Sequence, residues 1–287
     1  MPARQSPAEI DLAFFRENGF ILIPGVVPAA EVDAVVDATF EFLEVDPENS
    51  DTWYPEIHAS DGMVEIYQHQ ALWNTRQYPA IHAAFAAIYG QHRLWVSIDR
   101  VNFKPPFHPL HERFHTAGFM HLDPPALEPG RPDVHLHGLL FLNDSDSNQG
   151  GFHCLPGWHR NLDRWVDLVL PNNPYDGFEG VEMSALPEEV ACVEGRKGDL
   201  LIWHNSLPHG NAISCSHMPR LAQYIAMFPA QAPSPWLDAR ISAWRWREPL
   251  WAPWVRGDTR YKERQMQREP AVLTSLGRRL LGLDSWE

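Results

Sequence analysis

Three side chains of metal-binding types occur at informative positions in the sequence. His121 and Asp123 are separated by one residue, so on an extended segment both side chains point to the same face. A distant histidine, His209, follows a strand-like run and adds a second imidazole. Two histidines and one carboxylate on one face of an octahedron bind Fe(II) in non-haem oxygenases and leave three positions open. The pattern therefore predicts an iron site built from His121, Asp123 and His209.

An arginine lies eleven residues after His209, at the start of the run LAQYIAMF. A hairpin at this point would bring Arg220 beside His209, with its head group in the same cavity. An arginine buried near a metal needs an anion, and its planar fork binds a carboxylate through two hydrogen bonds. The C5 carboxylate of 2-oxoglutarate is such an anion, so Arg220 is predicted to anchor this co-substrate.

A competing metal motif overlaps the first. The stretch HERFHTAGFMH matches the zinc signature of metzincin-like proteases, in which His111, His115 and His121 would bind zinc and Glu112 would act as the general base. That motif requires a helix, whereas the preceding stretch KPPFHP contains three prolines and follows a strand-like segment. The protease reading also leaves Asp123 without a role, so the iron site is favoured and the zinc metalloprotease stays as an alternative.

Two further histidines alternate on the run VHLHGLLFL, at His135 and His137. One face of this strand should point into the interior of the fold. Because no second carboxylate accompanies the pair, we predict ordinary strand histidines and not a second metal site.

The elements that must position these residues change character along the chain. Residues 1–90 read as mainly helical, with helices predicted over 6–19, 28–43 and 78–89 and a strand over 20–23. From residue 91 to 230, short β-rich runs alternate with Gly, Pro, Asn and Asp turns, at 94–104, 134–143, 152–155, 189–193, 199–204 and 221–228. This order predicts a mainly β fold with flanking helices, in which helices pack on an antiparallel barrel or sandwich. We expect a single domain over 1–287.

The last segment, 231–287, is rich in tryptophan. Five tryptophans lie between Trp236 and Trp254. We predict that they clamp this extension onto the core, and a lid over a substrate pocket is the alternative. The seven Lys and Arg residues between 240 and 264 are expected to form a solvated basic face, in preference to a surface that recruits an anionic substrate.

Composition restricts the partners. The net charge of −14 argues against nucleic acid, whose phosphates need clustered Lys and Arg. Three cysteines without a close pair form neither a disulfide framework nor a thiolate zinc site. The start of the chain lacks the apolar run of a signal peptide, and no stretch approaches the ~20 apolar residues of a membrane span. We therefore expect a cytoplasmic protein that acts on a small molecule, without a membrane or nucleic-acid partner. The oligomeric state is left open.

Four stretches of the sequence carry a family resemblance: FFRENGFILIPGVV, HLD, LLFLNDSDSNQGGFHCLPGWHRN and EGRKGDLLIWHNSLPHGNAISCSHMPR. Over roughly residues 10 to 230 the chain resembles the phytanoyl-CoA dioxygenase (PhyH-like) family of Fe(II)/2-oxoglutarate-dependent oxygenases, with Trp158 where that family usually has serine. The resemblance implies a double-stranded β-helix, that is, a jelly-roll or cupin-like core, with N-terminal helices.

The same resemblance implies roles for individual residues. His121, Asp123 and His209 would be the iron ligands, Arg220 the 2-oxoglutarate anchor and Asn211 a second co-substrate contact. Related halogenases have Gly or Ala at the position of Asp123, so hydroxylation or another C–H oxidation is favoured, with O2 consumed and 2-oxoglutarate converted to succinate. A secondary metabolite or a lipid-like molecule is the expected substrate. A catalytically inactive β-helix binding or sensor protein is a further alternative, because fold alone does not imply activity.

Overall fold

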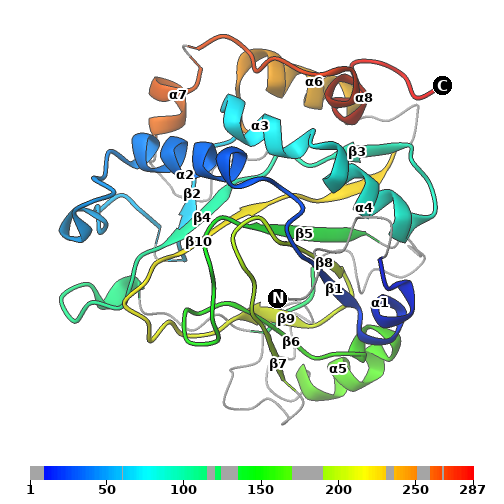
Figure 1. Ribbon diagram of the computed structural model, residues 1–287, viewed down its shortest axis with the longest axis horizontal. Coiled ribbons are helices and arrows are strands. Elements are labelled where there is room, and N and C mark those ends of the chain that lie inside the picture. The colour runs from blue at the N-terminus through cyan, green and yellow to red at the C-terminus, as the bar shows by residue number, and fades with distance from the viewer. Residues whose placement is uncertain are drawn as a thin grey trace.

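Two antiparallel sheets lie face to face, and helices cover the outer face of the larger sheet (Figure 1). This arrangement is seen in a computed structural model, which describes residues 10–59, 61–114, 120–123, 135–169, 190–230, 236–250, 259–266 and 268–287. In the described part of the chain, no helix combines the length and the apolar character needed to cross a membrane.

The N-terminal part is helical, as expected. Its elements are α1 (Leu12–Asn18), β1 (Phe20–Ile23), α2 (Ala29–Leu43), α3 (Gln70–Arg76) and α4 (Pro79–Tyr89). Helix α1 begins later than predicted, because Asp11 caps it by accepting a hydrogen bond from the backbone N–H of Phe14 at 2.9 Å. Gly19 ends it in the left-handed conformation, at φ 82°. The predicted cap at residues 6–9 lies outside the described residues, and helix α3 was not predicted.

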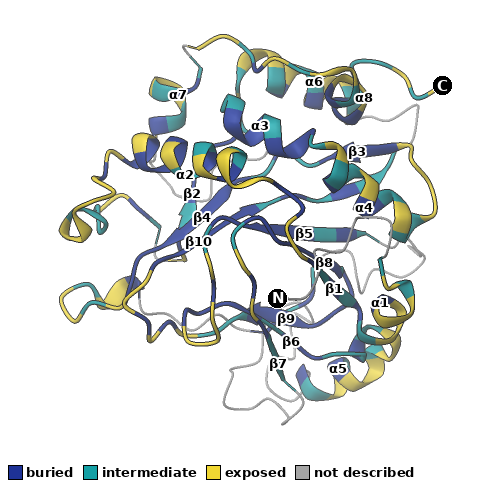
Figure 2. Cartoon of the chain, in the orientation of Figure 1, coloured by how far each residue is buried: buried dark blue, intermediate teal, exposed yellow. Residues whose placement is uncertain are grey.

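The large sheet has the order β1-β8-β5-β10-β4-β2, with β11 and β3 joined to β5 at one side. Its further strands are β2 (Met63–Val64), β3 (Leu94–Val96), β4 (Val101–Lys104), β5 (Leu136–Phe141), β8 (Leu200–His204), β10 (Arg220–Tyr224) and β11 (Met227–Pro229). Figure 2 shows that the central strands are buried along most of their length, because helices cover one face and the small sheet covers the other.

The small sheet has the order β7-β6-β9, formed by β6 (Phe152–Cys154), β7 (Ala191–Val193) and β9 (His209–Asn211). A bridge between His121 and His209 adds one more segment to its edge. Along the chain, β5, β8 and β10 enter the large sheet while β6, β7 and β9 enter the small one. This arrangement is a double-stranded β-helix, and the predicted fold is confirmed.

Strand alternation divides the apolar residues between two cores. Leu221 and Ile202 belong to a large cluster with the helices, whereas their neighbours Ala222 and Trp203 belong to a second cluster between the sheets. The second cluster also contains Phe152 of the small sheet. Each strand of the large sheet therefore has one face toward the helices and one face toward the space between the sheets.

The C-terminal extension lies on the helix-covered side of the large sheet (Figure 1) and contains α6 (Leu237–Trp246), α7 (Arg260–Arg264) and α8 (Ser275–Leu281). Trp244 Nε1 donates to the carbonyl of Ala271 at 3.0 Å, and Trp286 Nε1 donates to the carbonyl of Leu94 at 3.0 Å. Of the five tryptophans in the prediction, Trp244 packs against the core, whereas Trp236 and Trp246 are exposed. Among the described residues the predicted clamp therefore holds for Trp244, and Trp286, outside the predicted set, adds a second contact. Trp251 and Trp254 lie outside the described residues.

The prediction of a solvated basic face is wrong for Arg240 and Arg260, which are buried, and for Arg247, which is only partly exposed. Arg240 is buried, and its Nη2 donates to the carbonyls of Val96 at 2.6 Å and Leu280 at 3.0 Å. Arg247 donates to the carbonyls of Gln265 and Met266. Arg240 thereby connects the extension to β3, and Arg247 connects α6 to the residues that follow α7.

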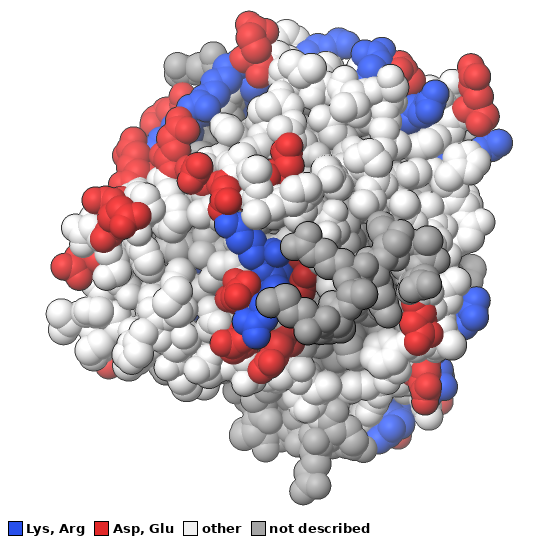
Figure 3. Space-filling view, viewed as in Figure 1, with Lys and Arg blue, Asp and Glu red and all other residues white. Residues whose placement is uncertain are grey.

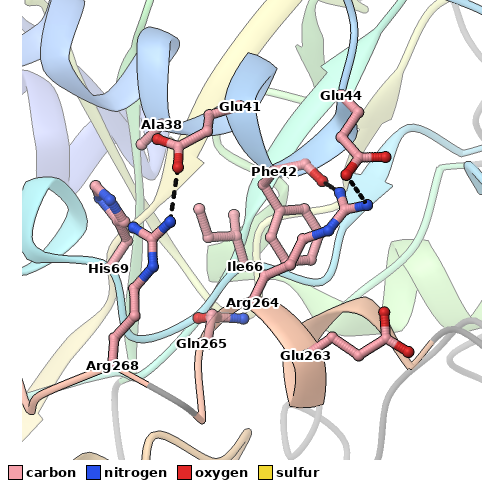
Figure 4. A pocket seen from close by; sticks show the side chains of 10 residues that line it. All are labelled: Ala38, Glu41, Phe42, Glu44, Ile66, His69, Glu263, Arg264, Gln265 and Arg268. Atoms are coloured by element: carbon pink, nitrogen blue, oxygen red, sulfur yellow. Dashed lines mark hydrogen bonds and ion pairs between the residues drawn. The ribbon is translucent and has the colours of Figure 1, made fainter.

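A cavity of about 540 Å³ separates α2 from the C-terminal extension. Figure 4 shows two ion pairs that span it: Arg268 to Glu41 at 2.6 Å, and Arg264 to Glu44 at 2.7 Å. A carboxylate already pairs with each of the two arginines. We therefore interpret the cavity as part of the contact between α2 and the C-terminal extension, and call this contact the joint.

On the face shown in Figure 3, Lys and Arg side chains are interspersed with Asp and Glu. Among the ion pairs of the described residues, Arg196 lies 3.2 Å from Asp144 and 3.5 Å from Asp146, and Lys197 pairs with Asp33. Mixed charge of this kind attracts neither polyanions nor polycations strongly.

Candidate metal centre

His121, Asp123 and His209 meet in the structure. Each offers one ligand atom, and the three atoms lie within 4.8 Å of one another. The backbone positions the two histidines, because the N–H of each donates to the carbonyl of the other, at 2.8 and 2.9 Å. The ring centroids are 4.5 Å apart. The N–H of Asp123 donates to the carbonyl of Asn205 at 3.2 Å. This bond fixes the backbone of Asp123, which is on the same segment as His121.

The orientation of His209 suits a metal ligand. Its Nδ1 lies 2.9 Å from the carbonyl oxygen of Leu207, which can only accept, so we assign the proton to Nδ1. The lone pair then lies on Nε2, 3.5 Å from Asp123 Oδ2. The ring stacks on Phe152 at 5.3 Å and contacts Trp203 at 5.1 Å. Burial lowers the pKa of His209 to about 4, which keeps the imidazole neutral and able to bind a metal.

Asp123 is held in its anionic form. Burial alone would raise the pKa of this carboxyl, but His137, His209 and His121 and a hydrogen bond from Trp203 outweigh it and lower the pKa to about 2. Trp203 Nε1 donates to Asp123 Oδ2 at 3.1 Å. The set of two imidazoles and one oriented carboxylate therefore fits a divalent ion such as Fe(II).

Two neighbours of the candidate ligands were missed in the sequence analysis. Trp203 was assigned only to a buried strand, and His137 to an ordinary strand position. His137 Nε2 lies 3.7 Å from Asp123 Oδ2, and its ring stacks on Trp203 at 5.8 Å. The group of ligand atoms found among the described residues consists of His121, Asp123 and His209, and that His137 has no metal role stays a prediction. Since β5 and β8 pair His137 with Trp203, the strand register would have identified both.

Arg220 reaches the space between the sheets by a different route from the predicted one. Strand β9, which carries His209, pairs in the small sheet, and strand β10, which begins at Arg220, pairs in the large sheet. The expected hairpin is therefore wrong, because the chain crosses from one sheet to the other between the two residues. Arg220 still shares the inner face, since Ala222, two residues along, packs in the cluster between the sheets.

Asn211 lies on the inner face of the small sheet. It pairs with Phe152 in the register of β6 and β9 and is two residues from His209, so its side chain shares the face of that ligand. Its contact with a co-substrate stays a prediction.

In the part of the zinc motif that the structure describes, residues 111–114 and 120–121, no residue belongs to the α-helix that a metalloprotease needs. Residues Glu112–Phe114 form a short 3-10 turn. The His111 ring stacks on Tyr54, with centroids 4.3 Å apart and an interplanar angle of 7°. His115 lies outside the described residues, and His121 is bonded to His209. The one histidine shared by the two motifs is therefore part of the His-Asp-His group.

Comparison with known proteins points to one family. The family model described as phytanoyl-CoA dioxygenase (PhyH) matches residues 15–220. A protein of Dictyostelium discoideum named putative phytanoyl-CoA dioxygenase is 23% identical over 260 residues, covering 75% of this chain and 74% of that protein. The Ava biosynthesis cluster protein O of Aspergillus versicolor is 21% identical over 242 residues, covering 75% and 76%.

Solved structures share the fold. The epimerase SnoN, crystallised with Fe3+, alpha ketoglutarate and nogalamycin RO, superposes with a TM-score of 0.56 at 18% identity, covering 92% of this chain and 94% of that one. The hypothetical protein JW0805 from Escherichia coli gives a TM-score of 0.67 at 17% identity, covering 93% and 80%. HygX from Streptomyces hygroscopicus, with nickel and 2-oxoglutarate bound, gives 0.56 at 16% identity, covering 76% and 86%.

Proposed function

Because the chain belongs to the phytanoyl-CoA dioxygenase (PhyH) family, whose model matches residues 15–220, we propose that it is an Fe(II)/2-oxoglutarate-dependent dioxygenase. It oxidises a C–H bond of a small organic molecule and couples this oxidation to decarboxylation of 2-oxoglutarate. The observation that carries the proposal is the His121, Asp123 and His209 group, whose ligand atoms lie within 4.8 Å of one another.

In this proposal each residue has one task. His121, Asp123 and His209 hold Fe(II) and leave three positions for the co-substrate and O2. When bound, the iron and 2-oxoglutarate supply the oxidising chemistry, with succinate and CO2 as co-products. Arg220 binds the C5 carboxylate of the co-substrate, and Asn211 provides a second contact to it.

The residues around the proposed ligands orient these ligands and exclude water from the site. The carbonyl of Leu207 and the indole of Trp203 fix the orientation of His209 and Asp123. The apolar cluster between the sheets includes Leu139, Leu201 and Phe152. A dry interior keeps the electrostatic interactions at the metal strong and limits side reactions with solvent.

The substrate class we propose is a secondary metabolite or a lipid-like small molecule. Support comes from relatives: SnoN was crystallised with nogalamycin RO, and a curated relative is named for a biosynthesis cluster. In this proposal the carboxylate of Asp123 fills a coordination position that is left free in related halogenases, which have Gly or Ala there. We therefore propose hydroxylation or a related C–H oxidation.

The test is substrate-stimulated formation of succinate by the purified chain, reconstituted with Fe(II), across a panel of acyl-CoA thioesters, free acids and natural-product scaffolds. His121→Ala and Asp123→Ala should reduce turnover to the level without enzyme. His153→Ala is the matched control, since this histidine is on the same small sheet and its ring contacts the carbonyl of Gly151. If either ligand variant retains near-wild-type turnover, the assignment is wrong.

A further inference from the structure

One histidine on the inner face of the large sheet is not used by the fold. His137 of β5 pairs with Trp203 of β8, and Trp203 belongs to the apolar cluster between the sheets. Leu139, two residues further along β5, belongs to the same cluster. Side chains alternate along a strand, and directly paired residues share a face of the sheet. The His137 ring therefore points into the space between the sheets.

This ring lies next to the candidate metal site. Its Nε2 is 3.7 Å from Asp123 Oδ2, and the same carboxylate oxygen is 3.5 Å from Nε2 of His209. Trp203 stacks on one face of the His137 ring, with the centroids 5.8 Å apart and an interplanar angle of 25°. A molecule that binds to the His137 ring would therefore lie beside the proposed metal ligands.

The ring nitrogens of His137 keep their capacity to form hydrogen bonds. The separation of 3.7 Å from Asp123 is too long for a hydrogen bond, and among the described residues His137 forms no other polar contact. Its side chain is 31% exposed, whereas that of His209 is 8% exposed. A neutral imidazole has one donor and one acceptor nitrogen. His137 can therefore offer both to a molecule that enters from solvent.

The cluster that shares this face with His137 is apolar. It contains Leu139, Leu201, Phe152 and Ala222. A molecule that packs beside this cluster displaces water from the His137 ring, and a buried polar group without a hydrogen bond is unfavourable. The molecule therefore binds best if it replaces that water with a hydrogen-bonding group of its own and is apolar over the rest of its surface.

The charge at the metal restricts which polar group fits beside His137. Asp123 places a negative charge next to the ring. With Fe(II) and the doubly charged 2-oxoglutarate bound, the net charge at the metal stays negative, so a carboxylate or phosphate would be repelled here. A hydroxyl group is neutral and can both donate and accept a hydrogen bond. It therefore suits a neutral imidazole in either tautomer.

We propose that His137 is a substrate-binding residue that forms a hydrogen bond with a hydroxyl group of the substrate, beside the C–H bond to be oxidised. This inference rests on the proposed function and narrows its substrate class to a neutral, hydroxylated small molecule with an apolar body. A plain hydrocarbon chain, or a molecule with an anionic group at this position, is disfavoured. His137 contacts the substrate and does not hold the metal.

The experiment measures binding to the full chain loaded with Fe(II) and 2-oxoglutarate in the absence of O2. Equilibrium dialysis compares probes of two skeletons that carry a hydroxyl group, a hydrogen or a carboxylate: 2-naphthol, naphthalene and 2-naphthoate, and 1-octanol, octane and nonanoate. His137→Leu removes both ring nitrogens, and His137→Gln keeps a donor and an acceptor. His153→Leu is the control, because its neighbours Phe152 and Cys154 face the inner cluster and its own ring points the other way.

His137→Leu should weaken binding of the hydroxylated probes about 3- to 10-fold, the range expected for one hydrogen bond between neutral groups, and should not weaken binding of naphthalene or octane. His137→Gln should keep most of the wild-type affinity, and His153→Leu all of it. Equal losses for hydroxylated and unsubstituted probes, or no loss for either, would overturn the role of His137.

The wild-type chain covers the case in which His137→Leu does not fold. It should bind 2-naphthol more tightly than naphthalene, or 1-octanol more tightly than octane, and the carboxylates most weakly. The absence of a preference for the hydroxyl group in both skeletons contradicts the proposal but leaves the proposed function standing.

Bound iron separates the substrate role from a role at the metal. Elemental analysis should find as much iron in His137→Leu as in the wild-type chain. A loss of iron from this variant would assign His137 to the metal site and overturn the substrate role. If the wild-type chain itself binds no Fe(II), the proposed function falls.

Discussion

The two faces of the large sheet treat polar side chains differently. On the helix-covered face, buried polar groups satisfy one another: Thr75 Oγ1 donates to Gln223 Oε1 at 2.7 Å, and Gln223 Nε2 donates to the carbonyl of Leu72 at 3.1 Å. On the inner face, His209 and Asp123 offer ligand atoms to one candidate metal site, and the buried Arg220 lies on the same face. Matched polar groups stabilise the fold, whereas unmatched ones in one cavity indicate a binding site.

The largest expected effect comes from removing a ligand on the inner face. His209→Ala should lower bound iron to near zero and abolish succinate formation, because the remaining pair offers only two protein ligands. Elemental analysis of the anaerobically loaded chain measures iron directly. Stoichiometric iron in this variant would contradict the assignment of His209.

A smaller effect is expected from the residue that orients a ligand. Trp203→Phe keeps the ring that packs against His209 but removes the hydrogen bond to Asp123. We expect Fe(II) affinity to fall about 10- to 100-fold, as found for such supporting contacts, with little change in Tm. Competition with a metal chelator measures the affinity. Unchanged affinity would show that Asp123 is oriented by other contacts.

A change on the helix-covered face should lower the stability of the protein and leave its affinity for the co-substrate unchanged. Thr75→Val leaves Gln223 Oε1 without its donor in a buried place, which should lower the free energy of unfolding by about 1–3 kcal/mol. Affinity for 2-oxoglutarate should stay the same. Chemical denaturation and calorimetric titration test the two halves of this prediction. A loss of co-substrate affinity with stability intact would break the distinction between the faces.

The smallest effect is expected at the joint beside the cavity. Arg268→Ala removes an exposed ion pair with Glu41 and should change the free energy of unfolding by less than about 1 kcal/mol. The Arg268 hydrogen bond lowers the pKa of Glu41, so any stabilisation is present above the unfolded-state pKa and is lost as pH falls through the folded-state pKa. Denaturation at pH 7 and pH 3 checks this, and the difference between variant and wild type should be smaller at pH 3 than at pH 7. A larger loss of unfolding free energy would show that the contact between α2 and the C-terminal extension contributes substantially to stability.

Much of the site could be predicted because its signals are local. The spacing of His121 and Asp123 follows from the two-residue repeat of an extended chain. Family motifs in the sequence mark His209 and Arg220, and the change from helical to strand periodicity near residue 91 indicates the fold class. Each of these signals needs only neighbouring residues in the sequence.

Only the tertiary structure decided how distant strands pair. It placed His209 and Arg220 on different sheets, put Lys104 opposite Arg220, and set Trp203 against Asp123, which is 80 residues away in sequence. The register between strands depends on the packing of the whole core, and a shift of one residue would turn each side chain to the other face. The chemical identity of the candidate ligands was therefore determined by the sequence, and their supporting contacts by long-range packing.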